Sequence, residues 1–127
     1  MPKYPFTPTC RTLTQILTDH NLAQLGDAYI NFIYSLALSA RKGQPSGKKV
    51  KGAVLADALR KAGLRECMPS RMTSHDLADA AEALIVYAWL SNHITLEESV
   101  TTLQQTDELN DGFARLLKKA KDRVMLS

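Results

Sequence analysis

The chain has 127 residues, 45% of them hydrophobic, and 16 basic against 13 acidic side chains give a formal net charge of +3. This length is enough for one packed domain and short for two, so we expect a single domain over residues 1–127. No uncharged apolar run is long enough to cross a bilayer, and the first residues lack the apolar core of a secretory signal. A cytoplasmic protein with no membrane partner is therefore expected. The small positive charge permits nucleic-acid binding without indicating it.

Helical patterns account for most of the first half of the chain. Thr7 followed by Pro8 predicts the start of a helix that continues to about residue 19. Residues 21–40 are apolar on nearly every face, which predicts a central helix surrounded by protein. Residues 41–52, RKGQPSGKKVKG, contain Gly, Pro and Lys but no acid, so they are interpreted as a basic connecting loop.

The next two helices are separated by a short loop. Residues 53–64 form an amphipathic pattern, with Gly63 placed to end the helix. Residues 65–72 are expected to be a loop, and Thr73 or Ser74 then caps a helix over about residues 75–91. This helix is again apolar almost all round.

The C-terminal part predicts two further helices. Thr95 and Glu98 have the spacing of a capping box, and Thr106 or Asp107 is suited to begin a last amphipathic helix. No strand-like alternation or internal repeat is present. The predicted fold is therefore all-α, with five to six helices.

Two of these helices carry polar stripes on otherwise apolar surfaces. Spacings of four, three, four and four place His20, Gln24, Asp27, Asn31 and Ser35 on one face of the first. Spacings of three place Asp76, Asp79 and Glu82 on adjacent turns of the second. Each stripe must face something polar.

Carboxylates on buried helices are costly unless they are paired, hydrogen-bonded or bound to a metal. Asp27, Asp79 and Glu82 would repel one another if they converged, and a hard divalent cation such as Mg²⁺ or Mn²⁺ would turn that repulsion into affinity. The alternative is that Asp27 and Glu82 pair with Arg or Lys side chains from elsewhere in the fold.

Two segments resemble the signatures of the ribonuclease III family. LGDAYINFIYS at 25–35 is similar to the first and LADAAEALIVYAWL at 77–90 to the second, in the family's order. The resemblance implies an endoribonuclease that hydrolyses double-stranded or structured RNA, with a helical homodimer as its fold. It also implies that Asp27, Asp79 and Glu82 bind Mg²⁺, or Mn²⁺ in its place, and that Asp27 and Glu82 are catalytic.

The chain also departs from the larger family members. They carry glutamates seven and four residues before the aspartate of the first motif, where this chain has His20 and Ala23. In this respect it resembles the compact mini-ribonuclease III type, which has no separate double-stranded-RNA-binding domain. The residues after Asn92 continue in a helical pattern, so RNA affinity would have to come from the nuclease domain itself.

Supporting and RNA-binding residues are expected around this centre. His20, Asn31 and Asp76 are candidates to orient water or the metal-binding acids. Duplex RNA is recognised mainly through its backbone and 2′-hydroxyls, which requires basic loops. The candidates are Arg41, Lys42, Lys48, Lys49, Lys51 and Arg71, and the alternative is an ordinary solvated loop.

Two other classes of function stay open. The missing glutamates at His20 and Ala23 suit a non-catalytic RNA-binding or scaffold protein that keeps the ribonuclease III-like fold. A helical protein-interaction module with no role in RNA is the third possibility, because helical domains host many functions.

Overall fold

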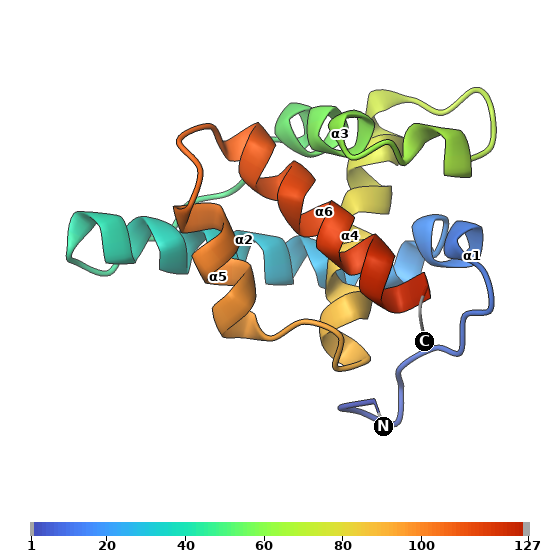
Figure 1. Cartoon of the computed structure of the whole chain (residues 1–127), viewed down its shortest axis with the longest axis horizontal. Helices are drawn as coiled ribbons and strands as arrows, with labels where there is room; N and C mark the ends of the chain where they lie inside the picture. Colours follow the sequence, from blue (N-terminus) through green and yellow to red (C-terminus); the bar gives the residue numbers. More distant parts are fainter. Residues whose placement is uncertain (1, 126–127) are drawn as a thin grey trace.

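The computed structural model describes residues 2–125, and none of these residues lies in a β-strand. They form six α-helices and one 3₁₀ turn (Figure 1). The elements are α1 (Leu13–Leu17), α2 (His20–Lys42), α3 (Gly52–Lys61), η1 (Arg65–Cys67), α4 (Ser74–Leu90), α5 (Leu96–Gln104) and α6 (Leu109–Met125). The all-α prediction is confirmed. No helix within residues 2–125 is long and apolar enough to cross a membrane.

Helix α4 lies at the centre of the fold. It packs most extensively against α2, which it crosses, and α1, α3 and α6 also pack on it (Figure 1). Helix α5 lies between α2 and α6. The side chains from Ala80 to Val86 are buried without interruption, which confirms the prediction that this helix is enclosed by protein. Burial of this apolar surface is the main term that stabilises the fold.

Helix α2 differs from its prediction as an enclosed helix. Helix α4 and α5 cover one side of it, and the other side is open, with Leu25 40% and Phe32 53% exposed. An all-round apolar sequence does not say which neighbour covers each face, and within residues 2–125 no element covers this one. The exposed apolar face of α2 is therefore available to a partner.

Several helix boundaries also differ from prediction. Helix α1 begins at Leu13 because Thr12 and Gln15 form a capping box, whereas the Thr7 amide closes a turn onto Tyr4. Helix α2 continues through Lys42 and ends at Gly43, which adopts the left-handed φ of 75° that glycine tolerates. The loop is therefore shorter than the predicted 41–52.

The two C-terminal helices begin later or differently than expected. Helix α6 starts at Leu109, two residues beyond Asp107. Thr95 caps α5 by accepting a hydrogen bond from the Glu98 amide, but the Glu98 side chain turns to Arg123 instead of completing the capping box. A tertiary ion pair has taken the place of the local hydrogen bond from the N-cap backbone to this carboxylate.

Candidate functional site

The site lies where α2 crosses α4, and a glycine makes this crossing possible. A Cβ atom added to Gly26 would lie 2.2 Å from the backbone oxygen of Glu82. Real side chains do not approach that closely, so any larger residue would push the two helices apart. The close contact brings Asp27, the next residue, to the same level as Glu82.

Three carboxylates from the two helices line a single cavity of about 540 Å³. They are the three predicted metal ligands, Asp27, Asp79 and Glu82. Their environments differ, because Asp27 is exposed, Asp79 is half-buried and Glu82 is only 7% exposed. Asp27 is thus not the buried acid that the sequence suggested, since α2 has an open face.

Glu82 is the electrostatic centre of this group. Asp27 and Asp79 are the acidic neighbours that act on its carboxyl group. Burial, followed by the influence of Asp27 and then of Asp79, raises the pKa of Glu82 to about 8. A carboxyl group held among other carboxyl groups favours its neutral form.

No lysine or arginine of residues 2–125 lines the cavity. Its basic neighbours are His20 and His75, and the Nδ1 atom of His75 lies 3.4 Å from Asp79. His75 was not among the predicted site residues, although its position one helical turn before Asp79 is a usable signal. The alternative that Asp27 and Glu82 pair with Arg or Lys is therefore not supported.

The donor set suits a hard divalent cation. Mg²⁺ and Mn²⁺ prefer carboxylate oxygens, and a cation among these three groups would offset both the burial and the repulsion that raise the pKa of Glu82. Among residues 2–125, no three His, Cys, Asp or Glu side chains already stand in the arrangement of a ligand set. The fit therefore rests on the chemistry and proximity of the groups, not on preformed coordination.

Of the other residues in the two predicted stripes, some line the cavity and one caps a helix. His20 and Gln24 line the cavity with the carboxylates, as does Ala23, where the larger family members have a glutamate. Asp76 instead caps α4 by accepting a hydrogen bond from the Thr73 amide at 2.9 Å. These bonds from Thr73 hold the pKa of Asp76 below its ordinary value. Asp76 does not line the carboxylate cavity.

The C-terminal part of the α2 stripe, Asn31 and Ser35, faces the basic loop. The Asn31 side chain contacts Asp27 and also accepts a hydrogen bond from the Val50 amide. The Ser35 hydroxyl contacts the backbone of Lys48. The polar surface opposite this part of the stripe is therefore the backbone of the basic loop.

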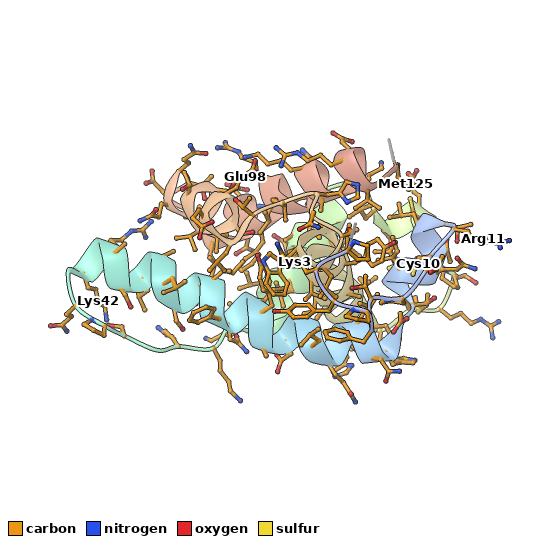
Figure 2. The ribbon with its side chains drawn as sticks, turned by 90° about the horizontal axis from the view of Figure 1, so that it is seen from below. Lys3, Cys10, Arg11, Lys42, Glu98 and Met125 are labelled. Carbon is orange, nitrogen blue, oxygen red and sulfur yellow. The ribbon has the colours of Figure 1, made fainter. Side chains whose placement is uncertain are left out.

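The six predicted RNA-binding residues are all exposed but do not form one cluster around the cavity. Val50 and Gly52 line the cavity, so Lys49 and Lys51 adjoin residues of its wall. Lys42 lies at the far end of α2, where the chain turns back (Figure 2). Arg71 lies in the loop before α4 with a left-handed φ of 63°. Of the six, Lys49 and Lys51 are the two whose chain neighbours line the cavity.

Comparison with known families gives one match. The family model described as ribonuclease III matches residues 20–124, which is most of the chain and includes all three carboxylates. No curated protein matches the sequence.

Proposed function

This chain belongs to the ribonuclease III family, and we propose that it is a divalent-metal-dependent endoribonuclease that hydrolyses phosphodiester bonds in double-stranded or structured RNA. The observation that carries the proposal is the position of Glu82, between Asp27 and Asp79 in one cavity that no Lys or Arg of the described residues lines. Acids gathered in a cavity without a Lys or Arg partner are candidates for a functional site.

Asp27, Asp79 and Glu82 would hold the cation. A bound Mg²⁺ or Mn²⁺ supplies Lewis-acid polarisation of a phosphate and lowers the pKa of a bound water. The chain's own groups position these acids. The α2–α4 crossing at Gly26 fixes the level of Asp27 relative to Glu82, and His75 contacts the carboxylate of Asp79. Helix α4 is buried, which gives the acids a rigid base.

The basic loop supports an RNA substrate. Lys48, Lys49 and Lys51 are exposed, and the loop leads into α3 at Gly52, on the cavity wall. Phosphates of a duplex that reached the carboxylates would pass these lysines. We expect RNA affinity to fall as salt is raised, and to fall less steeply when the three lysines are replaced by glutamine.

The open face of α2 supports a homodimer. Leu25 and Phe32 are exposed apolar side chains on this helix, and Phe6 of the N-terminal segment, which is 63% exposed, lines a small pocket with Leu25. Faces of this kind are costly in water and are usually covered by another surface. Light scattering of the wild type should give the mass of a dimer, and Phe32→Glu should shift it toward the monomer.

The direct test is cleavage of duplex RNA in Mg²⁺ or Mn²⁺. Asp27→Asn removes a charge from the cavity, and we expect it to lower the cleavage rate about 100-fold or more. Asp122→Asn is the matched control, because it makes the same chemical change at an exposed position of α6. Equal cleavage by Asp27→Asn and wild type would contradict the proposal.

A second candidate is an RNA-binding protein that does not cleave. It is favoured by His20 and Ala23, which line the cavity at the positions where larger family members carry glutamates. Duplex RNA binding by the wild type with no cleavage in either cation would select this function. Neither RNA binding nor cation binding would leave only a protein-interaction role.

A further inference from the structure

Asn31 connects the carboxylate cavity to the basic loop. Its side-chain amide nitrogen donates a hydrogen bond to Asp27 Oδ1 at 3.3 Å. Its side-chain oxygen accepts a hydrogen bond from the Val50 amide at 2.8 Å. One side chain therefore contacts a carboxylate of the site and the backbone of the basic loop.

The loop returns along α2 in a regular register (Figure 2). Ser39 bonds with the backbone of Ser46, Ser35 with that of Lys48, and Asn31 with that of Val50. Each step of four residues on the helix advances roughly 6 Å, and each step of two residues of extended chain advances roughly 6.6 Å. The two repeats match, so the side chains of one helix face hold the loop at three successive points.

These three contacts are not equivalent. The hydrogen bonds of the Ser35 and Ser39 hydroxyls go to the loop and to their own helix, whereas Asn31 also donates a hydrogen bond to Asp27. An asparagine side chain offers both an acceptor and a donor, which a leucine or an ionised aspartate does not. With its oxygen turned to the Val50 amide, its NH₂ group faces Asp27.

We propose that Asn31 is a positioning residue that sets the Asp27 carboxylate and the Lys48–Lys51 segment in one fixed arrangement, so that the RNA backbone and the cation-binding acids are aligned. This rests on the proposed function and assigns the residue that connects its two parts. Asn31 acts through Asp27 and through the loop, not on the RNA itself.

The experiment compares Asn31→Ala with Ser35→Ala, which loosens the same loop without touching Asp27. Three quantities are measured on each full-length variant, none of which requires cleavage. They are the Mn²⁺ affinity by calorimetry without RNA, the affinity for a short RNA duplex in chelator, and the hydrogen-exchange protection of the Val50 and Lys48 amides by NMR. Thermal unfolding checks that both variants fold.

Asn31→Ala should lower the Mn²⁺ affinity about tenfold, weaken duplex binding a few fold and remove protection at Val50. Ser35→Ala should remove protection at Lys48 and weaken duplex binding, but leave the Mn²⁺ affinity within about twofold of wild type. The difference in cation affinity is the result that a merely structural loop contact does not produce.

Two outcomes overturn the proposal. One is an unchanged Mn²⁺ affinity in Asn31→Ala, and the other is an equal loss of that affinity in both variants. Asp27→Asn in the same titration separates this failure from failure of the proposed function. If Asp27→Asn loses Mn²⁺ and Asn31→Ala does not, only the role of Asn31 is wrong. If Asp27→Asn keeps its affinity, the metal site itself is wrong.

Discussion

Glu82 and Glu98 are two glutamates on packed helices with opposite surroundings. Glu98 on α5 accepts two hydrogen bonds from the Arg123 guanidinium, at 2.5 and 2.6 Å, and Lys119 lies 3.8 Å away. The bonds from Arg123 hold the pKa of Glu98 below its ordinary value. Glu82 has Asp27 and Asp79 as its acidic neighbours, and its pKa is raised to about 8.

The comparison separates an acid that stabilises the fold from one that is kept for binding. The ion pair of Glu98 with Arg123 joins α5 to α6 and is partly exposed. The carboxyl group of Glu82 lowers the stability of the protein at neutral pH, because its burial and the charges of Asp27 and Asp79 oppose its ionisation. A group that costs stability and lines a cavity is a candidate for function.

The largest expected effect is on activity. Glu82→Gln should reduce duplex RNA cleavage in Mg²⁺ about 100-fold or more, because it removes a carboxylate from the cation site. Glu98→Gln makes the same change outside the cavity and should keep the rate within about twofold. Initial rates at saturating RNA give the comparison, and similar losses in the two variants would erase the distinction between the sites.

The next effect concerns the crossing that creates the acidic cavity. Gly26→Ala places a Cβ 2.2 Å from the Glu82 backbone oxygen and should destabilise the protein by about 3 kcal/mol. Gly52→Ala is the control, since its Cβ would meet Ala78 at an ordinary 3.8 Å. Urea unfolding measures both. A Gly26→Ala protein as stable as Gly52→Ala would mean that the helices do not cross this closely.

A third effect has the opposite sign. Because the pKa of Glu82 rises on folding from 4.5 to about 8, the folded state is not penalised below pH 4.5, and the penalty grows as the pH approaches 8. Glu82→Gln should therefore stabilise the metal-free protein by about 2 kcal/mol at pH 8 and have little effect at pH 4. Unfolding in chelator at both pH values tests this, and destabilisation at pH 8 would contradict it.

The smallest effect belongs to the ion pair. The pKa of Glu98 is lowered, so its contribution is present above its ordinary value of 4.5 and is lost as the pH falls through the lowered value. Because both side chains are partly exposed, Glu98→Gln should cost only about 1 kcal/mol at pH 7. Thermal unfolding from pH 7 to pH 3 should show the difference disappear, and a constant difference would refute the assignment.

Local sequence patterns were enough to predict the helices and the three acids of the site. They were not enough to predict which elements pack around them. Periodicity located α2 and α4, and the spacing of Asp79 and Glu82 placed both on one face. The predicted helix start at Thr7 was wrong, because the capping box of Thr12 and Gln15 begins the helix at Leu13 instead. The open face of α2 could not be foreseen, since periodicity shows that a face is apolar but not which element covers it.

Some features of the site could likewise be predicted from the sequence and others could not. The need for glycine at position 26 follows from the backbone of Glu82, which lies against it, and this contact cannot be predicted from the sequence. The α2 stripe was correctly predicted to face polar groups, but part of it faces the backbone of the basic loop through Asn31 and Ser35. Contacts between residues far apart in the sequence leave no periodic signal.

The most direct test of the account is the anomalous scattering of Mn²⁺ in crystals grown with that ion. We predict a peak between α2 and α4 that is coordinated by carboxylate oxygens of Asp27, Asp79 and Glu82, and no peak at Glu98. Saturating Mn²⁺ with no peak in the cavity would contradict the account, as would a Lys or Arg side chain found against Glu82 in its place.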